Sequence, residues 1–344
     1  MSQKHLFLCS LLLAGSATPA AFGLDPGVTK VETAQAFQEE LEKGQALLSQ
    51  GKVEDAVKAF KRANKLRNDA SAECYWGLAQ AYLKVGAHKN LRESCDQILR
   101  LTTETELQAK AHNLKGVALS AEAGGKIDKL KEAEREFRAA LGNSTSIPVV
   151  HFNLGVVLLQ QFRDAEGKAE LQEYLALAPT APSAQEARSY LENPRRARKN
   201  FAPNFSLTSM QGEYISLEDL QGKVVLVDFW ASWCGPCVAA ATELQALYKR
   251  YRKEKFVLLS ISSDRDEQAW RSFIAKNGME WPQYRDHDDR LSRLFMIRSI
   301  PAYFVIDGEG IVRHSIVGWG GDQRAILDFE IKKSLKALDR AEKR

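Results

Sequence analysis

The sequence lacks three features that would place it in other classes of protein. Its 48 basic residues outnumber its 44 acidic residues by only four, and so small an excess is not the charge pattern of a nucleic-acid-binding protein. It has one Cys-x-x-Cys and no second Cys-x-x-Cys or Cys-x-x-His to complete a zinc site. No apolar run reaches the roughly 18 residues that span a bilayer. We therefore expect no nucleic-acid partner, no metal and no cofactor.

The first 23 residues differ from the rest of the chain. A basic start is followed by the apolar stretch 6–15 and then by small residues up to Gly23. This is the pattern of a signal peptide over residues 1–23, with cleavage near Ala20 or Gly23, and an uncleaved anchor is the alternative. Lipidation is not expected, because Cys9 lies inside the apolar stretch. We expect an exported, periplasmic or otherwise extracytoplasmic protein with no membrane span beyond the signal segment.

The length of 344 residues is enough for two domains, and the first of them, over residues 31–193, is repetitive. Small residues recur at intervals of 35 to 39 positions, at Gly44, Ala79, Gly116 and Gly155. Such residues let two antiparallel helices approach closely while larger ones fill the core between them. The pattern resembles an array of tetratricopeptide (TPR) repeats, which implies an all-α superhelix of four helix pairs closed by a helix over 184–191.

Stacked helical repeats form a concave groove whose side chains either bind a peptide or face solvent. The TPR resemblance places seven residues on this groove: Trp76, Gln80, Leu83, Asn113, Val117, Phe152 and Val156. We expect Trp76 and Phe152 to contact a protein or peptide partner. The alternative is that both aromatic side chains belong to the core.

Residues 194–200 separate the repeats from the second domain. They contain a proline, four basic residues and no apolar periodicity, so they predict an exposed linker. The second domain, over residues 201–344, alternates apolar strands with amphipathic helices. We expect strands over 204–208, 213–217, 223–230, 255–262, 302–307 and 311–318, and helices over 235–253, 266–277 and 322–341.

The strand over 223–230 leads directly into Trp233-Cys234-Gly235-Pro236-Cys237. Two residues between the cysteines let one helical turn hold both sulfurs within disulfide range, and the start of a helix favours a thiolate at Cys234. A Cys-x-x-Cys beside a βαβ pattern is typical of a dithiol redox centre. Asp228 interrupts the apolar strand, where burial raises its pKa and suits it to exchange a proton with Cys237. A hydrogen-bonded core aspartate is the alternative.

Two segments around these residues resemble thioredoxin: Phe229–Cys237 and Ile297–Pro301. The wider region 201–319 is similar to exported thioredoxin-like reductases of the TlpA/ResA type, through Ala202–Leu207 and Gly222–Val227. The resemblance implies an α/β thioredoxin fold after the TPR superhelix. It also implies a cis bond between Ile300 and Pro301 placed against the two sulfurs, with a trans proline at the strand entry as the alternative.

The resemblance implies that the substrate contacts Trp233, which offers a flat docking surface. It also implies that the backbone of Ile300 pairs with an extended segment of the substrate. Two positions depart from the TlpA/ResA pattern, because Ala240 and Thr242 stand where Glu and Pro often follow the second cysteine. The missing Glu argues against a specialisation in cytochrome maturation. The missing Pro removes a helix kink.

Two further groups of residues have both a structural and a functional interpretation. Cys74 and Cys95 lie on the two expected helices of the second repeat, either as small core residues or as a structural disulfide. The run Asp286-His287-Asp288-Asp289 has side chains that bind cations, but without further ligands we expect a solvated loop.

These observations predict an exported thiol-disulfide oxidoreductase. Cys234 attacks a disulfide of a protein substrate, Cys237 resolves the mixed disulfide, and an upstream thiol donor supplies electrons. The Gly-Pro pair between the cysteines resembles reducing members of the family, so we favour a reductase over an oxidase. Two alternatives remain: a TPR scaffold with a minor redox role, and a redoxin-type peroxidase, which needs a threonine where Ala231 stands.

Overall fold

The computed structural model describes residues 28–144 and 147–343, so the expected signal segment 1–23 lies outside the described residues. The chain divides into two compact units, of which the first ends at Arg198 and the second begins at Lys199. Within the described ranges, no helix combines the length and the apolarity that a bilayer crossing requires. The first unit is the helical unit, and the second, which carries the expected dithiol motif Cys234–Cys237, is called the redox unit.

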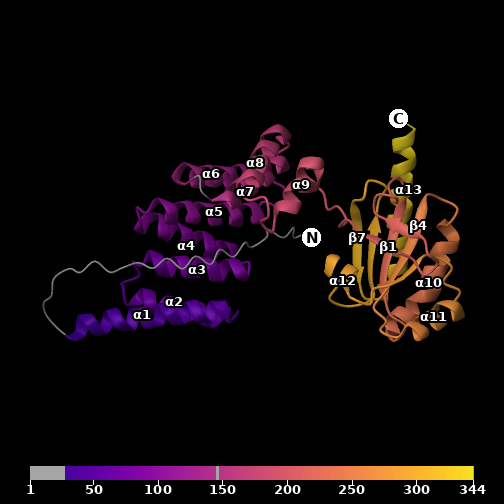
Figure 1. The fold of residues 1–344 in the computed structure, drawn as a ribbon, viewed down its shortest axis with the longest axis horizontal. Coiled ribbons are helices and arrows are strands. Elements are labelled where there is room, and N and C mark those ends of the chain that lie inside the picture. The colour runs from indigo at the N-terminus through magenta and orange to yellow at the C-terminus, as the bar shows by residue number, and fades with distance from the viewer. Residues whose placement is uncertain (1–27, 145–146, 344) are drawn as a thin grey trace. The chain divides into compact units, whose positions relative to one another are not determined.

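In the helical unit, consecutive helices pack against each other in pairs (Figure 1). The pairs are α1 (Val28–Ser49) with α2 (Val53–Lys65), α3 (Ala72–Lys84) with α4 (His88–Leu101), α5 (Thr105–Glu122) with α6 (Ile127–Asn143), and α7 (Pro148–Gln160) with α8 (Asp164–Leu177). A ninth helix, α9 (Ala184–Glu192), follows and packs against α8. The helix pairs and the closing helix agree with the repeat pattern of the sequence.

Two of the recurring small residues of the sequence, Gly44 and Gly116, lie where a ring crosses the backbone of a neighbouring helix. A Cβ atom added to Gly44 would lie 2.6 Å from the Phe60 ring, and one added to Gly116 would lie 2.6 Å from the Phe137 ring. Real Cβ atoms do not approach other atoms so closely, so only glycine lets these helices pack on the rings. Each ring is at least 99% buried.

The segment 194–200 is not the exposed linker that its composition predicts. Residues Pro194–Ala197 form a short 3₁₀ helix, η1, and Ala197 is buried in the core of the last repeat. The Arg198 guanidinium donates hydrogen bonds to the Leu159 carbonyl oxygen at 2.6 Å and to the Asp164 carboxylate. These contacts fix the segment up to Arg198 to the helical unit. Composition did not indicate this, because an alanine and the aliphatic stem of an arginine can cover apolar surface within an otherwise polar segment.

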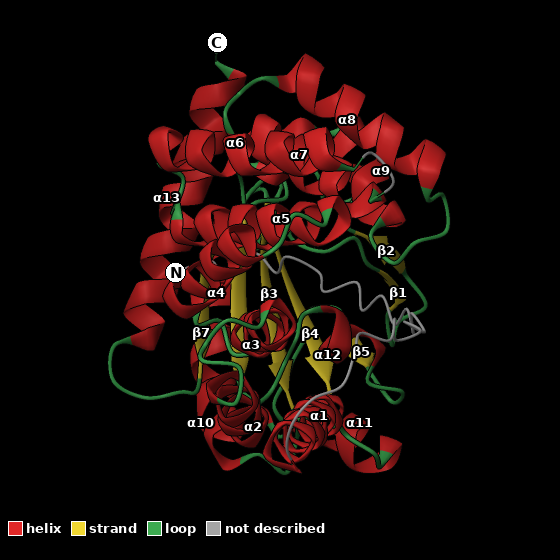
Figure 2. Ribbon diagram, turned by 90° about the vertical axis from the view of Figure 1, so that its left-hand side faces the viewer, coloured by secondary structure: helices red, strands yellow, loops and turns green. Residues whose placement is uncertain are grey.

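The redox unit is built on a mixed five-stranded sheet in the order β5-β4-β3-β6-β7 (Figure 2). The strands are β3 (Val224–Trp230), β4 (Phe256–Ser262), β5 (Gln283–Arg285), β6 (Ala302–Ile306) and β7 (Val312–Val317), and a separate hairpin joins β1 (Ser206–Thr208) to β2 (Tyr214–Ser216). Strand β3 pairs parallel with β4 and antiparallel with β6. Every residue of β3 is buried, as expected for a central strand, and all of them except Asp228 are Val, Leu or aromatic residues.

Each face of the sheet has its own core. One core contains residues of α10 (Gly235–Tyr251), α11 (Glu267–Lys276) and α13 (Gln323–Glu342), and we call it the cysteine-side core because Cys234 and Cys237 belong to it. The other core contains residues of the β1–β2 hairpin and of α12 (Arg290–Leu294). Strand β5 and helix α12 are additions to the elements expected from the sequence.

Candidate active site

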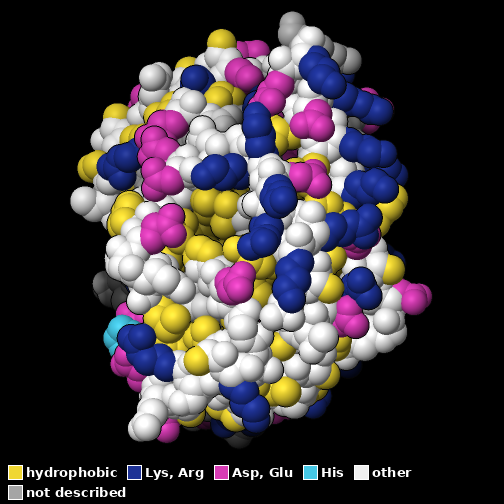
Figure 3. All heavy atoms as spheres, turned by 90° about the vertical axis from the view of Figure 1, so that its right-hand side faces the viewer, with side chains coloured by type: hydrophobic (Ala, Val, Ile, Leu, Met, Phe, Trp, Pro, Cys, Tyr) yellow, Lys and Arg dark blue, Asp and Glu magenta, His cyan; other side chains and the backbone are white. Residues whose placement is uncertain are grey.

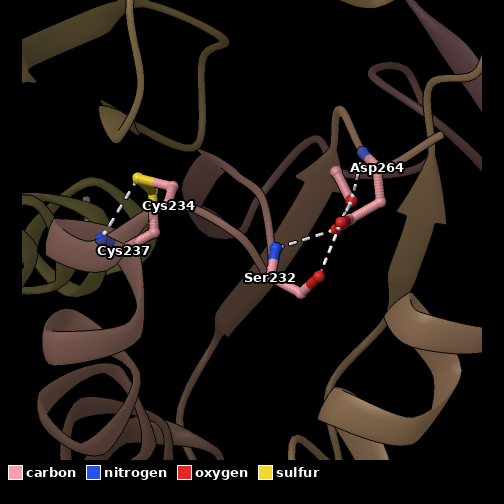
Figure 4. The surroundings of a disulfide bond; sticks show 5 residues. Ser232, Cys234, Cys237 and Asp264 are labelled. Atoms are coloured by element: carbon pink, nitrogen blue, oxygen red, sulfur yellow. Dashed lines mark hydrogen bonds between the residues drawn. A yellow bond between two sulfur atoms is a disulfide. The ribbon is translucent and has the colours of Figure 1, made fainter. Parts of the chain in front are cut away.

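The two cysteines of the motif lie at the junction between β3 and α10. Cys234 is the N-cap residue of α10, and its Sγ accepts a hydrogen bond from the Cys237 backbone N–H at 3.3 Å. The two cysteines form a disulfide with a Cα–Cα distance of 5.2 Å (Figure 4). When the bond is reduced, the unpaired N–H groups and the positive dipole end of α10 stabilise a thiolate at Cys234.

A buried carboxylate fixes the loop that carries the cysteines. Asp264, which follows β4, is 2% exposed and accepts hydrogen bonds from the Ser232 backbone N–H at 2.9 Å and from the Ser232 hydroxyl at 2.6 Å. The Ser262 hydroxyl donates a third hydrogen bond to it at 2.6 Å. Figure 4 shows Ser232 and Asp264 beside the disulfide. Sequence reasoning missed Asp264, although an acidic residue two positions after the end of a buried strand was a signal for it.

Asp228 lies on the same side of the sheet as the cysteines. Its neighbours at alternate positions of β3, Leu226 and Trp230, belong to the cysteine-side core, and side chains two residues apart share one face of a strand. Asp228 is 1% exposed, and its Oδ2 accepts a hydrogen bond from the Ser260 hydroxyl at 2.8 Å. Burial raises the pKa of Asp228 to about 7, and the hydrogen bond from Ser260 partly opposes this rise.

The peptide bond between Ile300 and Pro301 is cis. Pro301 is buried, and the half-buried Ile300 packs against the core that contains the two cysteines. The side chain of Trp233 is 67% exposed beside Cys234. An exposed indole directly before the first cysteine provides flat apolar surface to an approaching molecule.

The structure treats the two aromatic residues of the expected TPR groove differently. Phe152 is 3% exposed, and its ring contacts the rings of Tyr174 and Tyr190 at centroid distances of 5.3 and 6.3 Å. Its assignment as a partner contact is therefore corrected: Phe152 belongs to the core of the last repeat. Trp76 is partly exposed and packs beside the core between α4 and α5.

The other expected groove residues divide in the same way. Gln80 and Leu83 are partly exposed, whereas three are buried: Asn113, Val117 and Val156. The Asn113 side-chain oxygen accepts a hydrogen bond at 2.9 Å from the Asn153 amide, so this polar side chain is satisfied within the fold. Of the seven expected groove residues, only the three on α3 keep partly exposed side chains: Trp76, Gln80 and Leu83.

Cys74 and Cys95 are free thiols in the structure, and both are fully buried. Burial raises the pKa of Cys95 to about 12, which leaves it protonated and unreactive at neutral pH. The expected disulfide alternative is therefore not observed, and both thiols act as small core residues.

The acidic run 286–289 has a structural role. The Asp286 carboxylate accepts hydrogen bonds from the Leu291 and Ser292 backbone N–H groups at 3.0 and 2.7 Å, so it caps the short helix α12. Among the described residues, no group of three or more His, Cys, Asp or Glu side chains is placed to hold a metal ion. On the face shown in Figure 3, basic and acidic side chains are interspersed, as the nearly balanced composition predicts.

Comparison with known proteins finds a family match within each part of the chain. Residues 199–315 match the AhpC/TSA family, and residues 44–86 match the TPR repeat. The thiol-disulfide oxidoreductase ResA of Bacillus thuringiensis (strain Al Hakam) is 31% identical over 117 residues, which are 34% of this chain and 68% of ResA. ResA of Geobacillus kaustophilus is 30% identical, over 34% of this chain and 67% of its own length.

A solved thiol-disulfide oxidoreductase from Bacteroides fragilis is 31% identical, with a TM-score of 0.34, over 40% of this chain and 99% of its own. The predicted order of the fold, a helical repeat region followed by an α/β thioredoxin-like domain, is confirmed. The chain therefore belongs to the ResA family of thiol-disulfide oxidoreductases and carries a TPR region ahead of its redox domain.

Proposed function

We propose that this protein reduces disulfides of extracytoplasmic proteins through the Cys234–Cys237 dithiol, and that its TPR region recruits a protein partner. The observation that carries the proposal is the Cys234–Cys237 disulfide at the start of α10, on the same side of the sheet as a buried aspartate. The location is inferred from the signal-peptide pattern of residues 1–23. The Gly-Pro pair between the cysteines supports the reducing direction.

In the reduced protein, the Cys234 thiolate attacks one sulfur of a client disulfide. A mixed disulfide forms between Cys234 and the client, and the other client sulfur leaves as a thiolate. Asp228 then takes the proton of Cys237, whose thiolate attacks the Sγ of Cys234. The second client sulfur leaves, so the client gains two electrons and the protein is left with the disulfide seen in the structure. An upstream dithiol donor returns the protein to its reduced form.

Asp228 suits this proton transfer because of its environment. A carboxyl with a pKa of about 7 is partly ionised at neutral pH, so it both accepts and returns a proton. An exposed aspartate, with a pKa near 4, is a much weaker base. Asp228 reaches this range because its carboxyl is desolvated between β4 and β6.

Client docking is assigned to the surface around Trp233 and the cis Ile300–Pro301 bond. The exposed indole supplies apolar contact area, and the backbone of Ile300 offers hydrogen bonds to an extended client segment. Partner recruitment is assigned to the helical unit around Trp76, which is the aromatic residue of the expected groove that remains partly exposed. A partner held there is tethered to the chain that carries the dithiol, and tethering raises its effective concentration.

The proposal is tested by trapping clients. A Cys237→Ala variant leaves Cys234 able to attack but unable to be resolved, so clients accumulate as mixed disulfides that a reducing agent releases. The double variant that also carries Cys234→Ala is the matched control and traps nothing. Failure of the wild-type protein to reduce insulin with a chemical dithiol, or a set of trapped proteins that the double variant also retains, contradicts the proposed reductase function.

The recruiting role of the TPR region is tested by the same trap without the repeats. The fragment that begins at Lys199 retains both cores of the redox unit, because all their members lie between residues 202 and 335. We expect this fragment to reduce insulin at the rate of the full chain but to trap a different set of clients. Identical sets from the two proteins contradict recruitment of redox clients by the repeats.

A further inference from the structure

A row of polar side chains crosses the buried interior of the sheet at the level of Asp228. The β3–β4 register pairs Asp228 with Ser260, the β3–β6 register pairs Asp228 with Tyr303, and the β4–β5 register pairs Ser260 with Gln283. All four residues are at most 1% exposed. Buried polar groups cost folding free energy unless they are hydrogen-bonded. A row of them beside a redox centre therefore calls for a functional explanation.

Three of these residues lie on the cysteine side of the sheet. Tyr303 is itself a member of the cysteine-side core. Ser260 alternates with Leu258 along β4, and Leu258 also belongs to that core. Since alternate residues of a strand share one face, Ser260 and Asp228 both lie beneath the helices that carry and support the cysteines.

The hydrogen bonds in this row have a fixed direction. The indole Nε1–H of Trp281, a fully buried side chain, donates to the Ser260 Oγ at 2.8 Å. An indole nitrogen only donates, so the Ser260 oxygen is the acceptor in this contact. A serine hydroxyl has a single proton, and the proton of Ser260 is directed to the Asp228 Oδ2 at 2.8 Å. The order Trp281→Ser260→Asp228 is therefore set by the chemistry of the groups.

The two oxygens of Asp228 consequently differ. Oδ2 receives the Ser260 proton, whereas Oδ1 is buried and has no hydrogen-bond partner within the described part of the chain. A proton that binds to Asp228 without breaking the chain of hydrogen bonds binds to Oδ1. The unpaired oxygen is thus the one available for proton exchange.

The geometry points to Ser260 and Trp281 as positioning residues for proton transfer: together they hold Oδ2 of Asp228 as an acceptor and leave Oδ1 to take and return the proton of Cys237. This inference rests on the role of Asp228 in the proposed function and adds the two residues that orient it. Ser260 has a second effect, because its hydrogen bond favours the ionised carboxylate. It lowers the pKa of Asp228 against the effect of burial and so keeps it near neutrality.

Few other groups titrate near Asp228. Tyr303 of β6 faces it, and burial together with the neighbouring carboxylate raises the pKa of Tyr303, so that the phenol stays protonated. From α10 the two cysteines join the same core, and in the disulfide form they carry no proton. Helices α11 and α13 add apolar side chains to this core, among them Trp270, Ile274, Leu327 and Ile331. In the oxidised protein, the titration of Asp228 can therefore be measured without overlap from the titration of the two cysteines.

The test is the titration of Asp228 in the oxidised full-length protein. Aspartate labelled with ¹³C at the side-chain carboxyl reports ionisation by NMR, and the signal of Asp228 is assigned by its loss in Asp228→Asn. We expect Ser260→Ala to move the titration upward by about one pH unit, the value for loss of a hydrogen bond to a charged group. Ser260→Thr retains a hydroxyl and is expected to titrate near the wild-type pH.

Trp281→Phe tests the other end of the chain. It frees the Ser260 hydroxyl to turn away from Asp228, so we expect an upward shift that is smaller than in Ser260→Ala. Trp270→Phe is the matched control: Trp270 lies in the same core and is 3% exposed, but its Nε1 has no hydrogen-bond partner in the described chain. We expect no shift in this control. The rise of insulin reduction with pH should move with the titration in each variant.

Two results overturn the inference. The first is that Asp228 titrates at the wild-type pH in folded Ser260→Ala, and the second is that its titration shifts equally in Trp281→Phe and Trp270→Phe. If Ser260→Ala does not fold, Trp281→Phe and Ser260→Thr decide the question. Failure of the proposed function is recognised separately, because Asp228→Asn would then reduce insulin as fast as wild type whatever the titrations show. If Asp228→Asn is slow and Ser260→Ala has a wild-type titration and pH profile, the proposed function stands and this inference fails.

Discussion

Replacing Asp228 by asparagine is expected to make the protein more stable and less active. The carboxyl is buried between β4 and β6, and burial raises its pKa from 3.8 to about 7. Between these two pH values the folded protein holds a proton that the unfolded chain has released. The stability of the folded protein therefore falls as the pH rises through this window and levels off above about pH 7. Asparagine is uncharged in the folded and in the unfolded protein, so the variant does not lose stability in this way as the pH rises.

The size of the effect follows from the pKa. Each pH unit between the two values costs the wild-type protein about 1.4 kcal/mol relative to the variant. The slope halves at pH 7, where the carboxyl is half ionised in the folded protein, so from pH 5 to pH 7 the advantage of Asp228→Asn should grow by roughly 2 kcal/mol. The amide oxygen of asparagine still accepts the hydrogen bond from Ser260, so the substitution removes the charge without leaving that hydroxyl unpaired.

Urea unfolding at a series of pH values measures this difference. Tryptophan fluorescence reports mainly on the redox unit, because all the tryptophans except Trp76 lie at or beyond position 230. In the same variant, release of reduced client should slow by about tenfold or more, since Cys237 loses its proton acceptor. A stability gain that is the same at pH 5 and pH 8 refutes the raised pKa. Turnover equal to wild type from about pH 6 to pH 9 refutes the proton-handling role.

Three further predictions follow from the motif, the junction and the repeats. The redox potential should lie near that of thioredoxin, about −270 mV, when the protein is equilibrated with a glutathione buffer, and a value above about −150 mV contradicts a reductase. Limited trypsin digestion should cut at Lys199 before it cuts at Arg198, which is held by hydrogen bonds to Leu159 and Asp164. Early cleavage after Arg198, identified by mass spectrometry, contradicts the anchored junction. Gly116→Ala should lower the stability of the helical unit by about 1–3 kcal/mol, because the added Cβ clashes with the Phe137 ring. The control is Gly142→Ala in α6, whose added Cβ meets open space and should leave the stability unchanged or raise it. Thermal unfolding of the two variants measures the difference.

The long apolar elements of the redox unit were readable from the sequence. The strand expected over 223–230 is β3, Val224–Trp230, and the helix expected over 235–253 is α10, Gly235–Tyr251. Strand β5 was missed because it has only three residues, of which Gln283 and Arg285 are polar, and it pairs with only three residues of β4. Its pairing depends on the neighbouring strand and leaves no local pattern in the sequence.

The sequence indicates the residues proposed to react, Cys234, Cys237 and Asp228, but not the residues that orient Asp228. The cysteines are adjacent in a short motif, and Asp228 interrupts an apolar strand, so local sequence indicates both. Ser260 and Trp281 have no local signal, since their roles depend on strand register and on a contact across 21 to 32 residues of chain. Sequence analysis of a single chain does not reveal such contacts.

Phe152 was expected to contact a partner, but it is buried, and the rings around it explain why. The ring of Tyr174 packs against Phe152 at a centroid distance of 5.3 Å. Tyr190 of the closing helix covers Phe152 from another direction, at 6.3 Å. The last repeat thus uses three aromatic rings to form its own core, and this removes Phe152 from any surface that a partner can reach.

The junction between the units is short, because the chain is held by hydrogen bonds on both sides of Lys199. On one side Arg198 is held by the helical unit, and on the other the Asn200 carbonyl oxygen accepts a hydrogen bond from the Val312 backbone N–H at 2.7 Å. The unanchored tether is therefore little more than Lys199, far shorter than the linker that composition predicts. The cysteines, Asp228 and its hydrogen-bond donor Ser260 all lie beyond this tether, so every residue of the proposed exchange belongs to the second unit and none to the repeats.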